Sequence, residues 1–528
     1  MRLLPAVLIA TATGGIAISY EIVWLRTFGF AMESRADSFG LLLGAYLGGL
    51  AIGAYVAGYY CQRLAADKAM GQTGIMTLLG GVLLTANIAA FLVVPAMAAC
   101  AELCHDVRNM DLAMVAVATT LIGLILPLTA HAALAPDHRA GPGFSFIYAG
   151  NIVGSVLGGL VTGFGLFDVF ALPQIAFLLA MGGMFVGTLV LAAGRSSPIR
   201  LILPVAGMIA AGLLLAHGTP ALYADVYGQL HYGGDFRRRG PLPTVIETNS
   251  GVVAVSRGGN LYSGGAYEGR FNVSPLPDKD SNRITRAYLP AAFHPNPIDI
   301  LFVGLGSGSW VQVLAHDPDV ETITVVEINP GFMDVVRRQP IVASLLKNPK
   351  VKIVVDDGRR YLRATDQRFD LIVQNTIVYW RAHATNLLSA EYFALTKARL
   401  RPGGRLYVNT TRSSVVHKTL LSVFPHALRY QNMFIVGNEP IAINRARFEA
   451  KLRLWKIDGN PVVPDALQYR NLFEFLINPT WTSIPTWETR TAIARRTRDI
   501  TTLTDDNMAT EFRWTKAYPK SRSKAPEK

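Results

Sequence analysis

The sequence predicts an all-α polytopic membrane domain followed by an α/β domain, which has a doubly wound parallel sheet and a small β-hairpin region at its start. Two observations lead to this fold class. Hydrophobic residues make up 51% of the 528 residues and charged residues only 16%, which is too apolar for a soluble enzyme of this size. The apolar excess lies before about residue 217, and strands alternate with helices from residue 244 onward.

Seven apolar runs in the first part reach the length of about 17–25 residues that spans a bilayer as a helix. The first run begins close to Met1 and lacks a small-residue cleavage site in the right place, so we interpret it as an uncleaved helix. The predicted spans are Leu3–Leu25, Ser38–Tyr60, Thr73–Ala99, Asp111–His131, Phe144–Phe167, Leu172–Ala193 and Leu201–His217.

Small residues at four-residue spacing predict close helix packing in two of these spans. The rows are Gly44 with Gly48 and Gly49 with Gly53 in the second span, and Gly154 with Gly158 and Gly159 with Gly163 in the fifth.

Glu21 and Asn151 are polar residues inside predicted spans, where an ionisable group by default marks function. For Glu21 we favour a structural interpretation, in which an interfacial carboxylate pairs with Arg26. The functional alternative is a transporter with a regulatory nucleotide domain, and Glu21 and Asn151 are its only support.

The net charge of +13 fits anionic lipid headgroups better than nucleic acid, because no nucleic-acid motif accompanies it. Cys100 and Cys104 could pair only in an oxidising compartment, and free thiols are the favoured interpretation. No metal site is predicted. The numbers of Lys and Arg residues in the short loops on the two sides of the membrane are equal, so they do not predict the orientation of the helices. One side carries Arg2, Arg63, Lys68, Arg139, Arg195 and Arg200, and the other carries Arg26, Arg35, Arg108, Arg237, Arg238 and Arg239.

The second part reads as a hairpin at 251–265 followed by strand–helix units. The units begin at residues 298, 321 and 351, a fourth strand lies at 369–376, and a helix, turn and fifth strand fill 388–411. We therefore predict a membrane domain at 1–217, a linker at 218–243, a Rossmann-like domain at 244–440, and a C-terminal extension with a basic tail at 441–528.

The candidate cofactor site combines a glycine turn with acids at successive strand ends. Gly304, Gly306 and Gly308 form G-x-G-x-G after the first strand, unlike the G-x-G-x-x-G of dinucleotide sites. Glu327 ends the next strand, where an acid accepts hydrogen bonds from ribose hydroxyls. Asp356 and Asp357 end the third, where an acid can bond an adenine amino group. This order indicates an adenosyl sulfonium; the alternative is a Rossmann-like domain without a ligand.

Residues 245–438 resemble the spermidine synthases, the polyamine aminopropyltransferases, in the segments "HPNPIDILFVGLGSGSW", "VVEINP", "VDDGRRYL", "FDLIVQNT", "LLSAEYF" and "LRPGG". With the helical part included, the whole chain is similar to bacterial membrane-fused spermidine synthases. The resemblance implies the class I methyltransferase/spermidine synthase fold, a role in polyamine biosynthesis, and S-adenosylmethionine or its decarboxylated form as cofactor. It also implies the bacterial inner membrane, where we expect a cytoplasmic soluble domain because adenosyl sulfoniums are made in the cytosol. A homodimer stays open.

The acceptor half departs from that family. In the family the fourth strand ends in an acidic run whose first aspartate helps take a proton from the attacking amine, and Asn375 aligns with it here. Arg381, His383 and Arg283 near the acceptor would repel a dicationic diamine but suit a carboxylate or phosphate. His383, close to Trp380, is then the candidate general base. Alternatively, the segment "YWRAHATN" is a lid or a structural ion-pair cluster.

Further candidates lie in the stretch where the family supplies tyrosine, histidine and glutamate to the acceptor. This stretch reads "KDSNRITRAY" here and contains Arg286 and Tyr288. The acids that remain available are Glu268, Asp278, Asp280 and Glu391.

We therefore predict a membrane-tethered transferase that moves an aminopropyl group to a small-molecule acceptor other than ordinary putrescine. A methyltransferase dependent on S-adenosylmethionine is one alternative. A non-catalytic protein that acts as a sensor or binds a partner is another, favoured by the missing aspartate.

Overall fold

The computed structural model describes residues 1–66, 71–103, 107–135, 140–194, 198–280, 282–375, 378–463, 472, 474, 487–508 and 510–511. The chain forms two compact units. The helical unit comprises Met1–Ser34, Ser38–Arg257 and Ser263–Ala266. The α/β unit comprises Arg35–Asp37, Gly258–Tyr262 and Tyr267–Lys528.

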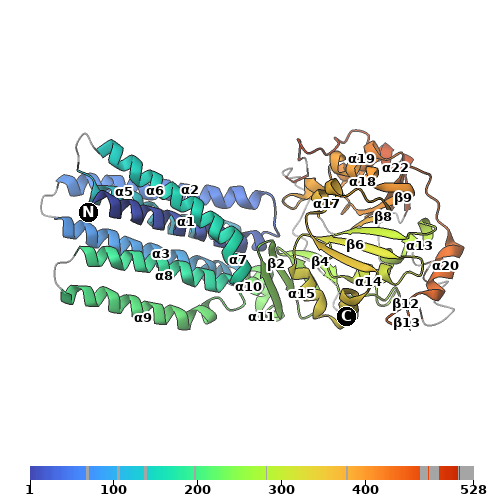
Figure 1. The fold of residues 1–528 in the computed structure, drawn as a ribbon, viewed down its shortest axis with the longest axis horizontal. Coiled ribbons are helices and arrows are strands. Elements are labelled where there is room, and N and C mark those ends of the chain that lie inside the picture. The colour runs from blue at the N-terminus through green and yellow to red at the C-terminus, as the bar shows by residue number, and fades with distance from the viewer. Residues whose placement is uncertain are drawn as a thin grey trace. The chain divides into compact units, whose positions relative to one another are not determined.

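Among its described residues, the helical unit contains seven helical stretches that are long and apolar enough to cross a membrane, which agrees with the predicted number. The fourth is interrupted at Leu124, and the fifth continues through a π-helical turn, η1 (Thr162–Leu166), into α7 (Phe167–Val169). Figure 1 shows the long helices running alongside one another: α1 (Leu3–Ala31), α2 (Asp37–Ala66), α3 (Gln72–Leu103), α4 (Val107–Gly123), α5 (Ile125–Ala133), α6 (Ala140–Val161), α8 (Leu172–Ala193) and α9 (Pro198–Leu222).

Helix α6 packs on α1 through the predicted glycines. A Cβ atom on Gly154 would lie 1.8 Å from the carbonyl oxygen of Thr11, so only glycine allows the two backbones to come this close. Asn151 donates a hydrogen bond of 3.3 Å to the carbonyl oxygen of Ala10. Asn151 therefore serves helix association here, because its amide is used within the packed interface.

Only part of each predicted small-residue row packs against a neighbour. Cβ atoms on Gly49 and Gly53 would lie 1.9 and 2.1 Å from Thr119 and Thr120 of α4. No described atom lies within 4 Å of a Cβ built on Gly44, Gly48 or Gly163. The prediction is wrong for these three, because four-residue spacing defines a helix face without showing which face meets a partner.

Arg26 of α1 pairs with a residue far along the chain. Its guanidinium lies 3.9 Å from the Glu247 carboxylate, donates to the carbonyl oxygen of Thr248 at 2.7 Å, and covers the Phe167 ring at 3.7 Å. The predicted pair of Glu21 with Arg26 is wrong, since residues five apart do not share a helix face. Glu21 is buried, and the structure records no hydrogen bond or ion pair for it among the described residues.

Residues 218–243, predicted as a linker, are mostly helical. They contain the end of α9 and the short helices α10 (Val226–Tyr232), η2 (Gly233–Asp235) and α11 (Phe236–Arg239). The predicted hairpin is present within a four-stranded sheet of order β1-β2-β3-β4. Its strands are β1 (Thr244–Thr248), β2 (Gly251–Val255), β3 (Asn260–Ser263) and β4 (Ala266–Arg270).

The α/β unit is built on an eight-stranded sheet of order β14-β10-β11-β9-β8-β5-β6-β7. All five predicted strands are present and parallel: β5 (Asp299–Val303), β6 (Thr322–Glu327), β7 (Val351–Val355), β8 (Phe369–Gln374) and β9 (Leu400–Asn409). Beyond the five predicted parallel strands, three antiparallel strands extend the sheet past β9: β11 (Met433–Gly437), β10 (His426–Tyr430) and β14 (Trp487–Thr489).

Strand order reverses between β5 and β8, which makes the turn after β5 the topological switch point where such sheets bind ligands. Helices α18 and α19 lie over one face of the sheet, and α14 and α15 over the other (Figure 1). The helices of this unit include α12 (Thr285–Tyr288), α13 (Pro290–Phe293), α14 (Ser309–Ala315), α15 (Gly331–Arg337), α17 (Gly358–Ala364), η4 (Ala384–Leu387), α18 (Ala390–Ala398), α19 (Ser414–Val423), α20 (Arg445–Leu454) and α22 (Arg490–Arg496).

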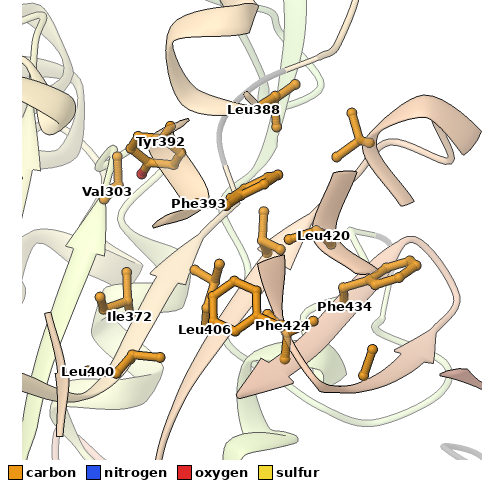
Figure 2. Packing of buried hydrophobic residues seen from close by; sticks show 14 of the residues in the cluster. Val303, Ile372, Leu388, Tyr392, Phe393, Leu400, Leu406, Leu420, Phe424 and Phe434 are labelled. Atoms are coloured by element: carbon orange, nitrogen blue, oxygen red, sulfur yellow. The ribbon is translucent and has the colours of Figure 1, made fainter. Parts of the chain in front are cut away.

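Alternation along the strands fixes which side chains enter the core. Leu301 and Val303 of β5 join one hydrophobic cluster with residues of β8, β9, β11, α18 and α19. Figure 2 shows Phe393 and Leu420 from the helices pointing toward Leu406 of β9. This packing holds the strand ends in place, and the candidate site is built on those ends.

Candidate functional site

The glycine turn between β5 and α14 has a backbone that favours glycine at all three positions. Gly304, Gly306 and Gly308 have φ values of 86°, 54° and 72°. A Cβ atom on Gly308 would lie 3.1 Å from side chains of α15 and η3 (Ser344–Lys347), so this glycine serves packing. No described atom lies within 4 Å of a Cβ built on Gly306. The turn therefore leaves open space beside Gly306, at the switch point of the sheet.

Glu327, at the end of β6, fixes this turn. One carboxylate oxygen accepts the backbone N–H of Leu305 at 2.6 Å, and the other accepts that of Asn329 at 2.8 Å. The side chain is buried, and burial raises the pKa of Glu327 to about 7 against the opposing hydrogen bonds. The backbone of Gly306 also hydrogen-bonds to this carboxylate, and three donors leave room for a fourth, such as a ribose hydroxyl. The open turn and this carboxylate together fit an adenosyl group.

Glu268 of β4 contributes a second buried carboxylate to this place. Its charge adds to the raised pKa of Glu327, so the two carboxylates lie near each other. Glu268 forms an ion pair with Arg381. Burial raises the pKa of Glu268, and Arg381 opposes that shift. Of the two interpretations of the segment around Arg381, this pair favours the structural ion-pair cluster.

Asp356 and Asp357 follow β7 and lie next to the end of β6. The backbone N–H of Asp356 donates to the carbonyl oxygen of Glu327 at 3.1 Å. Asp357 caps α17, because one of its oxygens accepts the backbone N–H of Arg360 at 2.8 Å. The Asp356 carboxylate accepts a hydrogen bond of 2.5 Å from the side chain of the same arginine. Both acids thus have structural contacts at the position predicted to meet adenine.

Ser309 is a site residue that the sequence did not single out. It is buried, and its hydroxyl donates to the carbonyl oxygen of Arg270 at 3.3 Å and accepts the backbone N–H of Asn272 at 3.2 Å. The hydroxyl of Ser307 donates to it at 3.0 Å. Ser309 thereby ties the glycine turn to the segment after β4. The signal available in the sequence was a helix-starting serine directly after the last glycine.

Asn375, which aligns with the aspartate of the family, begins a chain of amides across the strand ends. Its side-chain oxygen accepts from Asn409 at 2.9 Å, and the oxygen of Asn409 accepts from Asn432 at 2.9 Å. The oxygen of Asn432 accepts from the Arg286 guanidinium at 2.7 Å. This amide ladder contains no carboxylate, so it offers no base for a proton.

His383 is not brought to this ladder by any recorded contact. Its backbone has a φ of 64°, its N–H donates to Glu511 at 2.9 Å, and its ring is exposed without a recorded hydrogen bond among the described residues. Trp380 is half-buried. Thr376 and Ile377 of the same segment lie outside the described residues, as does Cys104 of the predicted cysteine pair.

The other candidate acids have separate partners. Asp280 is buried and accepts both the backbone N–H and the hydroxyl of Thr285, at 3.1 and 2.9 Å. Burial raises the pKa of Asp280 to about 6. Glu391, in the first turn of α18, accepts the backbone N–H of Asp505.

Tyr288, the candidate tyrosine, donates its hydroxyl to the carbonyl oxygen of Val273 at 2.5 Å, inside the core.

Comparison with known proteins adds a family to this geometry. Residues 285–435 match the family model of the spermine/spermidine synthase domain. The polyamine aminopropyltransferase of Streptococcus uberis is 34% identical over 118 residues, which are 22% of this chain and 41% of that relative. The polyamine aminopropyltransferase of Mycobacterium tuberculosis is 24% identical over 443 residues, 77% of this chain and 76% of that relative.

The chain thus spans about two fifths of the length of the Streptococcus relative. The Mycobacterium alignment covers 77% of the chain, which is more than the α/β unit contains, so it also includes part of the helical unit. A crystal structure of spermidine synthase from Thermotoga maritima aligns with a TM-score of 0.32 and 17% identity, over 42% of this chain and 79% of that one.

Replacement of Gly306 by alanine tests whether the open space beside the glycine turn holds an adenosyl ligand. We expect Gly306→Ala to weaken binding of an adenosyl sulfonium by about tenfold or more, because the methyl group enters that space. Calorimetric titration of the detergent-solubilised chain measures the effect. Gly459→Ala is the matched control, since Gly459 also has a positive φ, 83°, and no described atom within 4 Å. Equal weakening by both variants would contradict the assignment.

The raised pKa of Glu327 predicts a pH dependence of donor binding. Ribose hydroxyls donate more strongly to the ionised carboxylate, so affinity rises as pH rises through about 7. We expect the dissociation constant to be about tenfold lower at pH 8 than at pH 6, and Glu327→Gln to remove this slope. The pKa of Glu327 in the folded state, about 7, lies above the ordinary 4.5, so the folded chain holds this proton more tightly than the unfolded chain. The free energy of unfolding therefore falls as the pH rises from about 4.5 to about 7. An unchanged slope in the variant would assign the titration to Glu268.

Proposed function

We propose that this chain is a membrane-tethered transferase that binds decarboxylated S-adenosylmethionine and passes its aminopropyl group to a small-molecule amine other than putrescine. The observation that carries the proposal is the buried carboxylate of Glu327 beside the open turn at Gly306, within a spermidine synthase domain. Seven helices that are long and apolar enough to cross a bilayer support the tether.

The chain's own residues divide the work of holding the donor. Glu327 accepts the ribose hydroxyls, Gly306 leaves room for the adenosyl group, and Asp356 and Asp357 lie at the next strand end for the adenine. Glu268 offers a carboxylate to the ammonium of the donor tail. When bound, the donor supplies a carbon to which the acceptor nitrogen bonds while the C–S bond breaks, a neutral thioether leaves and one amine proton is lost.

The acceptor side explains why putrescine is a poor candidate. Putrescine is a dication, and a site for it needs carboxylates that offset its charge. The ladder from Asn375 through Asn409 to Asn432 presents amides, and it ends at the cationic Arg286. Alignment of the acceptor nitrogen beside the donor then supplies most of the rate, and the proton leaves to solvent or to an acceptor-borne group.

Methyl transfer from intact S-adenosylmethionine is the second candidate, favoured by one observation. The tail of that donor carries both an ammonium and a carboxylate. The Glu268–Arg381 ion pair presents both complementary charges next to Glu327. If the tail of S-adenosylmethionine replaced this internal pair, Glu268 would pair with the ammonium of the tail and Arg381 with its carboxylate, so each charge would keep an opposite partner.

Calorimetric titration with both adenosyl sulfoniums separates these candidates. For aminopropyl transfer we expect the decarboxylated form to bind at least about tenfold tighter, and Glu268→Gln to weaken it by about tenfold through loss of a charged hydrogen bond. Glu449→Gln is the control, because Glu449 pairs with Arg445 on the surface of α20. Tighter binding of intact S-adenosylmethionine would favour methyl transfer, and no binding of either would end the transferase proposal.

We place the protein in the bacterial inner membrane with the spermidine synthase domain on the cytoplasmic side. The reason is supply, because adenosyl sulfoniums are made in the cytosol. Two reporters fused after Lys528, one active only in the cytoplasm and one active only outside it, measure the side. We expect signal from the cytoplasmic reporter alone. Signal from the external reporter would separate the domain from its donor and overturn the proposal.

A further inference from the structure

We propose that the acceptor is the amine of a membrane-lipid headgroup, as in an aminophospholipid, and that it reaches the transfer site from the headgroup layer of the bilayer. The inference rests on the proposed transferase function and adds the chemical class of its acceptor. It is carried by the contacts of residues 378–388, which we name the acceptor segment. This segment follows Asn375 at the end of β8, the position that borders the acceptor in the proposed function.

The connection between the first two membrane helices meets the acceptor segment. Helix α1 ends at Ala31 and α2 begins at Asp37, so residues 32–36 are all that separate them. Within this connection, Arg35 belongs to the α/β unit and forms an antiparallel β-bridge with Arg381 of the acceptor segment. Residues opposite each other in such a bridge have Cα atoms about 4.5–5.5 Å apart. Arg381 is therefore held beside a residue that is joined, within a few positions, to two membrane spans.

The lipid-facing side chains of α2 show at what depth this connection lies. Among the described side chains of α2, the large hydrophobic ones that are exposed run from Phe39 to Tyr60. At a rise of about 1.5 Å per residue, they cover about 32 Å along the helix, close to the thickness of about 30 Å of a hydrocarbon core. Tyr59 and Tyr60 lie at the far end, as tyrosines at a membrane interface do. Phe39 therefore marks the near surface of the hydrocarbon, and Arg35, four residues earlier, lies in the headgroup layer.

A second stretch of chain brings the donor side to the same depth. A Cβ atom on Gly265, in the turn between β3 and β4, would lie 1.9 Å from the carbonyl oxygen of Phe30 in the last turn of α1. Glu268 lies three residues further along the chain, so it is no more than about 10 Å from Gly265. Glu268 is also the ion-pair partner of Arg381. Two separate stretches of chain thus hold this ion pair close to the headgroup layer.

The C-terminal extension fixes the rest of the acceptor segment. Both carboxylate oxygens of Glu511 accept backbone N–H groups of the segment, from His383 at 2.9 Å and from Thr385 at 2.6 Å. The segment is therefore held at several points along its length. Its bridge to Arg35 consequently sets a defined, short distance between the acceptor side of the site and the headgroup layer.

This placement matters for a lipid acceptor and not for a soluble one. A soluble amine reaches any open site by diffusion, whereas a headgroup stays in its layer and must be met there. An aminophospholipid headgroup carries one ammonium and one phosphate, and its neutral sum suits the neutral amide ladder from Asn375 to Asn432. In the reaction its uncharged amine nitrogen bonds to the aminopropyl carbon while the C–S bond breaks. The neutral thioether leaves, and one amine proton passes to water of the headgroup layer.

Nanodiscs that contain the full chain test the inference with two matched lipids. Phosphatidylethanolamine has an amine that can accept the group, and phosphatidylcholine has a quaternary nitrogen that cannot. With decarboxylated S-adenosylmethionine, we expect only the first lipid to gain the mass of one aminopropyl group. We expect it to react at least about tenfold faster than 2-aminoethyl phosphate, the same headgroup without acyl chains, because the bilayer raises its concentration at the site. Mass spectrometry follows both products.

Arg35→Pro tests the bridge itself, because proline lacks the N–H and seldom fits a paired strand. We expect lipid modification to slow by about tenfold, while calorimetry shows unchanged donor binding. Ala171→Pro is the matched control in another connection between membrane helices. Ala171 is exposed and has a φ of -74°, which proline adopts without strain, so this variant should modify the lipid at the original rate. Unchanged lipid modification in Arg35→Pro, or equal slowing in both variants, would contradict the role of the bridge.

The outcomes separate the inference from the proposed function. An adduct on 2-aminoethyl phosphate that forms as fast as the lipid adduct, or instead of it, would overturn the lipid acceptor and keep the transferase. Donor binding without an adduct on either amine would overturn the transferase. A phosphatidylethanolamine with a photoreactive headgroup then tests the lipid site without transfer. Labelling of residues 378–388 would support a headgroup site at the acceptor segment, and absence of labelling would overturn that site as well.

Discussion

The candidate site depends on one buried carboxylate. Glu327 joins the turn after β5 to the exit of β6 by accepting the backbone N–H groups of Leu305 and Asn329. A carboxylate removed from water is costly unless such donors compensate it. They compensate it only in part, as its raised pKa shows. The same group thereby fixes the open shape of the glycine turn and retains the capacity to accept further hydrogen bonds from a ligand.

The parts of this chain that the sequence predicts well are those with continuous local signals. Membrane spans and buried parallel strands are both unbroken apolar runs, so seven helices and strands β5 to β9 could be predicted. Pairings across the chain carry no local signal. Arg26 meets Glu247 rather than Glu21, and Ser309 bonds to the segment after β4. Antiparallel strands β10 and β11 were missed because they are only five residues long, and periodicity over so short a run is ambiguous.

On the acceptor side, the ion pairs seen in the structure change which of the cationic residues named from the sequence carry net charge. From sequence, Arg381 and His383 were the prominent cations. In the structure Arg381 is neutralised by Glu268, and His383 has an exposed ring away from the amide ladder. Arg286, from the stretch "KDSNRITRAY", instead joins the amide ladder through its hydrogen bond to Asn432. Asn375 keeps its predicted place at the end of β8, as the first member of a neutral ladder.

Glycine and strain are distributed differently over the two halves of the site. The donor half makes its left-handed turns with Gly304, Gly306 and Gly308, which adopt them at little cost. The stretch "KDSNRITRAY", expected on the acceptor side, makes one with Arg283, at a cost of about 1–3 kcal/mol. Glycine would remove that cost, and it would also remove the guanidinium group.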